Sequence, residues 1–271
     1  MKFKNVLVTG GSSGIGLDLA KAYVKQGANV ILMARNQARL DEAAAECAPL
    51  CLTADQQVLT YSVDVANQTE LEKCVAEIKT KTGPLDLLIL SAGIVQSIRF
   101  MDQSDQDFND IMNINVMGSR AVAKAFLPDM IKQGKGQVCF VSSLGGLMTT
   151  YGYSAYSASK YAVIGMAGAL RQELYRSGVG VSVLCPPEVD TPMVTNEAEH
   201  ILPETRFIKN IGGLLSPEHV AKATVKGIKK NKFIIIPGLV AKISYANSRY
   251  FPTAFAWTMQ KLVGLADRFV K

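Results

Sequence analysis

The feature that most constrains the fold is a regular alternation of short apolar runs and segments of helical periodicity along most of the chain. The apolar runs, many of them β-branched, predict strands at residues 4–9, 29–33, 58–63, 85–90, 137–141, 179–184 and 232–236. The segments between them predict helices at residues 14–26, 37–48, 68–80, 107–132, 155–176 and 217–230. Alternating strands and helices imply a parallel sheet covered on both faces. We therefore expect one doubly wound α/β domain over residues 1–237, with seven parallel strands.

A glycine-rich turn, T-G-G-S-S-G-I-G, joins the first predicted strand to the first helix at residues 9–16. Gly10 allows a tight turn, Gly14 lets the backbone approach a pyrophosphate, and Gly16 permits close packing of the helix on the sheet. The first N–H groups of that helix and its positive dipole end favour phosphate at this point. Many glycine turns are only structural, but this one has the flanking strand and helix that a Rossmann dinucleotide site requires.

The end of the second strand indicates which dinucleotide binds. Sites that prefer NAD place a carboxylate here to bond the ribose 2′-hydroxyl, whereas Ala34 is followed by Arg35 in this chain. A guanidinium binds a 2′-phosphate in a bidentate, charge-assisted manner, with Arg39 and Ser12 as further partners. The pattern favours NADP(H), and the alternative is that Arg35 is a solvated loop charge. Asp64, after the third strand, is either an acceptor for the adenine amino group or a simple turn residue.

Tyr156 and Lys160 are four residues apart in the segment Y-S-A-S-K, at the start of a predicted helix. This spacing puts both side chains on one face of the helix. A cation near a phenol stabilises the phenolate, so we expect the pKa of Tyr156 to be lowered toward neutrality. A tyrosine tuned in this way can act as a general acid or base.

Taken in order, these motifs resemble those of the short-chain dehydrogenase/reductase family, over about residues 3–236. The matching pieces are TGGSSGIG at 9–16, Asp64-Val65, Ser91-Ala92-Gly93, NINVMG at 113–118, Ser142-Ser143 and YSASK at 156–160. The resemblance implies that Tyr156 donates a proton to a carbonyl and that Ser143 holds the substrate oxygen. It implies that Lys160 binds the nicotinamide ribose and lowers the pKa of Tyr156. It also implies that Asn115 anchors a water that relays protons to Lys160, and a helix-kink role for Asn115 is the alternative or the complement.

The same resemblance implies a cofactor site assembled from several loops. Its residues are Gly10, Ser12, Ser13, Gly14, Ile15, Gly16, Arg35, Arg39, Asp64, Val65, Ser91, Ala92, Gly93, Tyr156, Lys160, Pro186, Val189 and Thr191. Two positions depart from the family pattern: Ser91 stands where Asn is common, and Pro187 where Gly is frequent. Ser91 makes fewer hydrogen bonds than Asn, and Pro187 lacks a backbone donor. Neither change removes a proton-transfer group.

The segments after the sixth strand indicate the substrate. CPPEVDTPM at 185–193, LPETR at 202–206 and LSPEHVA at 215–221 are similar to the 3-ketodihydrosphingosine reductase branch of the family. That branch reduces the 3-keto group of a long-chain 2-amino ketone with NADPH, in sphingolipid synthesis. The alternatives are a reductase of another apolar ketone, such as a steroid or a 3-oxoacyl group, and a catalytically idle NADP(H)-binding regulator. The intact Tyr156 and Lys160 argue against the idle regulator.

Residues of about 188–215 lie where the family has a substrate lid. Apolar residues in this segment would suit a long acyl chain, but an ordinary helical excursion packed on the core would show the same pattern. Glu188 or Asp190 could pair with a substrate ammonium group. The resemblance also implies a dimer or tetramer in which the long helices at 107–132 and 155–176 form the interface.

The positive charge of the chain is concentrated in its last quarter. Residues 1–200 contain 17 Lys and Arg against 20 Asp and Glu, whereas residues 201–271 contain 12 against 3. The extension 238–271 interleaves basic and aromatic residues, and apolar residues recur at helical spacing over 253–270. Such a segment suits peripheral contact with a membrane surface. Packing over the substrate site or against another subunit is the alternative.

Several functions are disfavoured by what the chain lacks. No sequence motif supports nucleic-acid binding, and no apolar run reaches the roughly 18 residues of a membrane-spanning helix. Cys47 and Cys51 have no histidine partners at recognisable spacing, so we expect no metal site.

Five cysteines without a secretory signal indicate a reducing compartment. We expect a cytoplasmic protein without the membrane anchor of eukaryotic members of the branch, with peripheral contact at the cytosolic membrane face as an option.

Overall fold

The computed structural model describes residues 3–269, with side chains described through residue 266. Its centre is a parallel sheet with the strand order β3-β2-β1-β4-β5-β6-β7. The strands are β1 Asn5–Thr9, β2 Asn29–Ala34, β3 Val58–Ser62, β4 Leu87–Leu90, β5 Gly136–Val141, β6 Val179–Leu184 and β7 Ile234–Ile235. The order reverses between β1 and β4, which defines a topological switch point. The predicted doubly wound Rossmann fold with seven parallel strands is confirmed.

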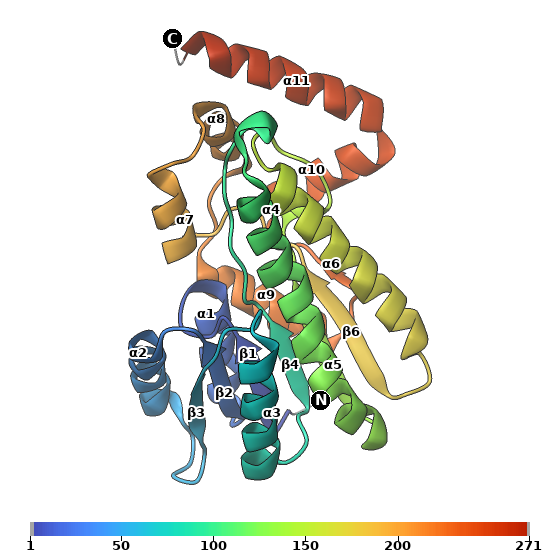
Figure 1. The fold of residues 1–271 in the computed structure, drawn as a ribbon. Helices are drawn as coiled ribbons and strands as arrows, with labels where there is room; N and C mark the ends of the chain where they lie inside the picture. Colours follow the sequence, from blue (N-terminus) through green and yellow to red (C-terminus); the bar gives the residue numbers. More distant parts are fainter. Residues whose placement is uncertain (1–2, 270–271) are drawn as a thin grey trace.

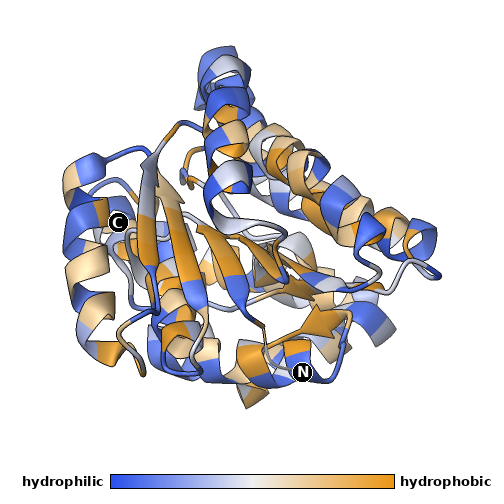
Figure 2. Ribbon diagram, turned by 90° about the horizontal axis from the view of Figure 1, so that it is seen from below, coloured by the Kyte–Doolittle hydropathy of each residue, from blue (hydrophilic) through white to orange (hydrophobic). Residues whose placement is uncertain are grey.

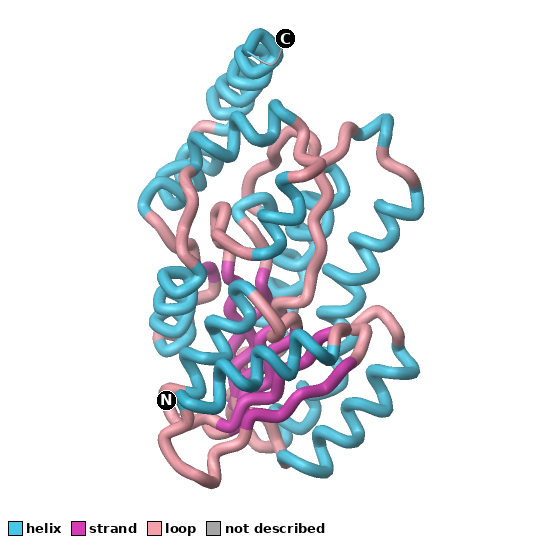
Figure 3. The backbone as a smooth tube through the Cα atoms, turned by 90° about the vertical axis from the view of Figure 1, so that its left-hand side faces the viewer, coloured by secondary structure: helices cyan, strands magenta, loops and turns pink. Residues whose placement is uncertain are grey.

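Helices cover both faces of this sheet (Figures 1 and 3). The α-helices of the described chain are α1 Gly14–Val24, α2 Gln37–Cys47, α3 Gln68–Thr82, α4 Asp105–Met112, α5 Ser119–Lys132, α6 Ser154–Glu173, α7 Pro192–Ala198, α8 Pro203–Gly212, α9 Pro217–Lys229, α10 Leu239–Tyr250 and α11 Pro252–Phe269. One core cluster joins the sheet to α3, α5 and α6, and the other joins it to α1, α2 and α9. Leu7 belongs to the first cluster and its neighbours Val6 and Val8 to the second. The strands are therefore apolar on both faces, and in Figure 2 the strand ribbons are coloured mostly as hydrophobic.

Polar side chains bracket the amino-terminal ends of the central strands. Asn5 Nδ2 donates to the carbonyl oxygen of Thr82 at 2.9 Å, and Asn5 Oδ1 accepts from Asn29 Nδ2 at 3.1 Å. Asp86 Oδ2 accepts from the backbone N–H of Asn5 at 3.1 Å. These bonds join β1, β2 and the entry to β4 at a point where the apolar core ends.

The helix predicted at 107–132 is longer and less regular than expected. It begins at Asp105, because the Ser104 hydroxyl caps it by accepting from the N–H of Asp107 at 3.1 Å. A wide π-helical turn, Asn113–Gly118, separates α4 from α5. A Cβ at Gly118 would lie 2.6 Å from Val65 Cγ2, so this turn packs tightly against the end of β3. Turns of this kind occur frequently at functional sites.

The carboxyl-terminal part also differs from the expectation. The strand predicted at 232–236 is reduced to Ile234–Ile235. The predicted tail helix is α11, but α10 before it was not predicted. Figure 1 shows α11 at the edge of the molecule, where it packs on the lid helix α8. In the part of the chain that the structure describes, no helix combines the length and apolar character needed to cross a bilayer. Lys271, the last basic residue of the tail, lies outside the described residues.

Candidate active site

A cavity of about 630 Å³ opens at the carboxyl ends of the strands. The loops that follow β1, β2, β3, β4, β5 and β6 line it, together with α7 and α8. Ligands of open α/β sheets bind at this edge, beside the switch point. All eighteen predicted cofactor residues and Ser143 line the cavity. Asn115 does not, and it lies buried behind the wall.

The glycine turn forms one side of this cavity. Gly10 and Gly14 have φ values of +64° and +53°, which side chains rarely adopt. A Cβ at Gly10 would lie 2.9 Å from the backbone nitrogen of Ala92, and one at Gly16 would lie 2.3 Å from the carbonyl oxygen of Gly10. Ser13 is the N-cap of α1 and makes no side-chain capping bond. The turn therefore leaves backbone N–H groups available, as a pyrophosphate of a dinucleotide requires.

Thr9 fixes the loop after β4 beside the glycine turn. Its hydroxyl accepts hydrogen bonds from the N–H groups of Ser91 at 3.0 Å and Ala92 at 3.1 Å. Thr9 is fully buried at the end of β1, and the sequence analysis did not single it out. A hydroxyl at the last position of an otherwise apolar strand was the available signal. Because the backbone of Ser91 is held by Thr9, the Asn-to-Ser departure leaves this loop in place.

The far end of the cavity carries the residues that are expected to bind the adenosine part of the cofactor. Arg35 and Arg39 line it, and neither guanidinium forms an ion pair with a described residue. Asn36 Oδ1 accepts from the N–H of Arg39 at 3.0 Å and so begins α2. Asp64 Oδ1 accepts from the N–H of Ala66 at 2.9 Å, which is a turn role, and Asp64 also faces the cavity. Both interpretations of Asp64 are compatible with this geometry.

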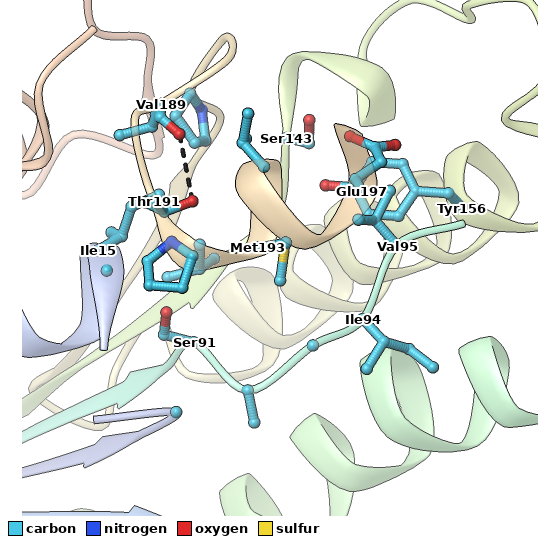
Figure 4. A pocket seen from close by; sticks show the side chains of 18 of the residues that line it. Ile15, Ser91, Ile94, Val95, Ser143, Tyr156, Val189, Thr191, Met193 and Glu197 are labelled. Atoms are coloured by element: carbon cyan, nitrogen blue, oxygen red, sulfur yellow. Dashed lines mark hydrogen bonds between the residues drawn. The ribbon is translucent and has the colours of Figure 1, made fainter. Parts of the chain in front are cut away.

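Three of the four residues with expected catalytic roles line the same cavity. Tyr156 and Lys160 come from the first turns of α6, and Ser143 follows β5. Figure 4 shows Ser143 and the Tyr156 ring in the same part of the cavity. The Lys160 ammonium donates to the carbonyl oxygen of Val141 at 3.1 Å and lies 5.6 Å from the centre of the Tyr156 ring. The Ser143 hydroxyl accepts from the N–H of Gly145 at 3.1 Å.

The pKa of Tyr156 shifts opposite to the expectation. Burial raises it to about 12, although a hydrogen bond with Ser143 lowers it. Burial also lowers the pKa of Lys160 to about 8. Desolvation disfavours the charged form of both groups, and the negative charge of Glu197 raises the pKa of Tyr156 further. The phenol is therefore protonated at neutral pH.

Asn115 occupies the π-helical turn and contacts the backbone behind the cavity. Its Oδ1 accepts from the N–H of Ile94 at 2.8 Å, and its Nδ2 donates to the Ile94 carbonyl at 3.0 Å and to Ser159 Oγ at 2.9 Å. A Cβ at Gly93 would lie 3.0 Å from Asn115 Oδ1 and 3.4 Å from Lys160 Nζ. Asn115 thus ties α4, α6 and the loop after β4 together next to Lys160.

The lid segment supplies the wall beyond Tyr156. Glu197 of α7 and Lys209 of α8 line the cavity, together with Tyr153 at the start of α6. The Lys209 ammonium lies 2.7 Å from Glu197 Oε2 and 3.1 Å from the Tyr153 hydroxyl, which in turn donates to Glu197 Oε1 at 2.5 Å. The sequence analysis missed these three residues. Charged residues inside a mostly apolar lid were the available signal.

The two expected ammonium partners, Glu188 and Asp190, lie in different surroundings. The side chain of Glu188 is only 6% exposed and pairs with Arg206 at 3.0 Å and Lys209 at 2.8 Å. Asp190 is exposed and does not line the cavity. Glu188 lines the cavity but already pairs with two cations, and Asp190 lies outside the cavity lining. The pairing of either residue with a substrate ammonium stays a prediction.

Neither a metal cluster nor the tail contributes to the site as far as the structure describes it. Among the side chains that the structure describes, no three His, Cys, Asp or Glu residues form a group that could hold a metal ion. The cavity is lined by residues up to Gly213, so the described part of the tail does not enter it. The side chains of Phe251 and Trp257 are 64% and 61% exposed, whereas the side chains of Arg268 and Phe269 are outside the described residues.

Comparison with known protein families connects this fold with a class of reaction. A model described as short chain dehydrogenase matches residues 4–202. The chain belongs to the short-chain dehydrogenase family. This membership makes it an oxidoreductase that acts on CH–OH or C=O groups, and the predicted family is confirmed.

Curated relatives of this short-chain dehydrogenase have names that are more specific than the family name. A 3-ketodihydrosphingosine reductase of Bos taurus is 39% identical over 84% of this chain and 69% of its own length. A 3-dehydrosphinganine reductase of Arabidopsis thaliana is 36% identical over 95% of this chain and 77% of its own length. Among solved structures, an actinorhodin polyketide ketoreductase variant with NADPH matches with a TM-score of 0.78 and 29% identity, covering 86% of this chain and 95% of that one.

Proposed function

We propose that this short-chain dehydrogenase reduces the 3-keto group of 3-ketodihydrosphingosine to the hydroxyl of dihydrosphingosine, with NADP(H) as cofactor. The observation that carries the proposal is the 39% identity to a 3-ketodihydrosphingosine reductase over 84% of the chain. The cavity supports it, because the lid contributes Met193, Val194 and Ile208 to a wall that suits an acyl chain.

The residues of the cavity fit NADP(H). The turn from Gly10 to Gly16 would hold the pyrophosphate, because it lines the cavity and leads directly into the N-terminus of α1, whose N-cap Ser13 makes no side-chain capping bond. Arg35 and Arg39 would hold the 2′-phosphate, since their guanidinium groups have no described carboxylate partner. When bound, the cofactor supplies the hydride that reduces a carbonyl carbon. The remaining chemistry is proton transfer, which falls to the protein.

Tyr156 is suited to donate the proton. With its pKa raised to about 12 by burial, the phenol keeps its proton at neutral pH and can deliver it to a carbonyl oxygen as negative charge develops there. The Ser143 hydroxyl would orient the same oxygen. Lys160, whose lowered pKa is still about 8, is charged at neutral pH and would stabilise the phenolate that remains. Asn115 would act as a positioning residue, through its bonds to the Ile94 backbone beside Lys160.

The Tyr156→Phe variant tests this assignment. We expect NADPH affinity to change less than about threefold, because the cofactor contacts remain, and turnover to fall at least 10³-fold, the upper part of the range for losing a general acid. NADPH fluorescence titration and NADPH oxidation with 3-ketodihydrosphingosine measure the two quantities. Retained turnover would refute the proton-donor role.

A ketone panel tests the substrate. It should contain 3-ketodihydrosphingosine, a steroid ketone and a 3-oxoacyl thioester, each at saturating NADPH. We expect the highest kcat/KM for the sphingoid ketone. A preference for one of the other ketones would replace the proposed substrate, and NADPH binding without turnover of any of them would favour a regulator.

We further propose that the tail makes peripheral contact with an anionic membrane from the cytoplasmic side. The support is the set of exposed side chains on α10 and α11: Leu239, Val240, Ile243, Tyr250, Phe251 and Trp257. Lys242, Arg249 and Lys261 lie among them. In liposome flotation with anionic vesicles, the double variant Phe251→Ser/Trp257→Ser should stay at the bottom, whereas Leu52→Ser, at a 63% exposed site far from the tail in sequence, should float like the wild type. Equal flotation of all three proteins would reject the contact.

A homo-oligomer is proposed through the long helices. Ile131 of α5 and Tyr161 of α6 are 42% and 44% exposed, although both are large and apolar or aromatic. Multi-angle light scattering at micromolar concentration should give the mass of a dimer or tetramer, and a monomer mass would contradict the proposal.

A further inference from the structure

The cavity contains one carboxylate close to the proton donor that the mechanism does not use. Glu197 lines the cavity and its side chain is 4% exposed. Tyr153 connects it to the catalytic tyrosine: the Tyr153 hydroxyl bonds Glu197 Oε1, and the rings of Tyr153 and Tyr156 have centres 5.3 Å apart. Figure 4 shows the Glu197 carboxylate in the same part of the cavity as the Tyr156 ring.

Glu197 keeps acceptor capacity after these contacts. Its described bonds are one to each oxygen, from the Tyr153 hydroxyl and the Lys209 ammonium. An ionised carboxylate offers about four acceptor sites. Lys209 also pairs with Glu188 at 2.8 Å, so it is shared between two carboxylates. If Glu197 turns to another cation, the Lys209 ammonium keeps Glu188 and is not left buried without a partner.

Other carboxylates in and around the cavity are worse placed. Glu188 also lines the cavity, but it pairs with Arg206 and shares Lys209 with Glu197. Asp64 follows β3 at the end of the cavity that holds Arg35 and Arg39, and Asp190 does not line the cavity. Glu197 is therefore the carboxylate that the described contacts link to Tyr156, through Tyr153.

We propose that Glu197 binds the 2-ammonium group of the substrate and so selects a 2-amino ketone over a plain long-chain ketone. The inference rests on the proposed sphingoid substrate, whose amino group is on the carbon next to the carbonyl. With the carbonyl oxygen at Tyr156, the adjacent ammonium lies on the wall formed by α7. The pair would be charge-assisted and shielded from water, which makes it stronger than a surface contact.

The test compares two substrates and three proteins. The substrates are 3-ketodihydrosphingosine and its analogue with hydrogen in place of the 2-amino group. For the wild type we expect kcat/KM to be at least roughly 10-fold higher for the amino ketone, the effect of one buried charged hydrogen bond. Glu197→Gln should lose roughly 10- to 100-fold on the amino ketone and change less than about threefold on the analogue.

Glu188→Gln is the matched control, because it also removes a carboxylate partner of Lys209 but not the carboxylate near Tyr156. It should change both substrates by the same factor. Equal losses on both substrates in Glu197→Gln, or no wild-type preference for the amino ketone, would overturn the inference. The wild-type comparison remains decisive if the variant does not fold. If the wild type reduces neither ketone while it binds NADPH, the proposed function itself fails.

Discussion

Lys160 imposes a cost on stability that can be measured in the cofactor-free protein. Burial lowers its pKa from 10.5 to about 8, and one pKa unit corresponds to about 1.4 kcal/mol. The buried ammonium therefore destabilises the folded state by about 3 kcal/mol at pH 7. Lys160→Met removes the charge but also the hydrogen bond to the Val141 carbonyl, worth about 1 kcal/mol. We expect the variant to be more stable than the wild type by about 2 kcal/mol at pH 7.

The pH dependence of the stability difference between Lys160→Met and the wild type distinguishes the buried charge from a change in packing. Because the folded-state pKa lies below the unfolded-state value, the unfolded chain binds more protons between pH 8 and 10.5. The contribution of Lys160 to the free energy of unfolding therefore rises with pH over this window, and the cost disappears above it. The advantage of Lys160→Met should shrink to about zero at pH 9.5, where only about 1.4 kcal/mol of the cost remains.

Urea denaturation followed by circular dichroism at pH 7 and pH 9.5 measures these differences. Tyr156→Phe is the control, because its phenol has a pKa of about 12 and stays neutral at both pH values. Its difference from the wild type should change by only about 0.2 kcal/mol between the two pH values, because the unfolded-state phenol begins to ionise at pH 9.5. If Lys160→Met is destabilised by the same amount at both pH values, the buried-charge argument is refuted.

Three further changes test the cofactor side of the site. Arg35→Ala should raise the Kd for NADPH roughly 10- to 100-fold and leave the Kd for NADH nearly unchanged, and equal losses would show that Arg35 does not contact the 2′-phosphate. Gly16→Ala places a Cβ 2.3 Å from the Gly10 carbonyl oxygen, so urea denaturation should show a loss of about 3 kcal/mol. Thr9→Val leaves the N–H groups of Ser91 and Ala92 without their acceptor and should cost about 2 kcal/mol and weaken NADPH binding, whereas Thr9→Ser should retain both properties.

The elements predicted correctly are those whose signal is local. The strands are nearly continuous apolar runs because both faces of the sheet are buried, and the turn at Gly10 to Gly16 carries its constraint in consecutive residues. The Tyr156 and Lys160 pair shares one helix face, so spacing alone placed the two residues together.

The features that escaped prediction depend on distant contacts. The pKa of Tyr156 is set by burial, which the spacing of Tyr156 and Lys160 does not report. A helix kink at Asn115 was among the expectations, but its π-helical form depends on how Asn115 reaches the Ile94 backbone. The cluster of Glu197 and Lys209 joins two lid helices to Tyr153, so no short segment contains it.

Because both faces of the sheet are buried, hydrophobic burial alone does not fix the register of its strands. In a sheet with one wet face, a slip by one residue would expose the apolar set to water and is prevented by that penalty. Here Val6, Leu7 and Val8 are all fully buried, so a slipped β1 would still present apolar side chains to both layers of helices. The alignment must come from the polar ends, where Asn5 bonds Asn29 and Thr9 bonds the loop after β4. The Thr9 hydroxyl, which holds the loop beside the cofactor cavity, therefore also helps to fix the register of the central strands.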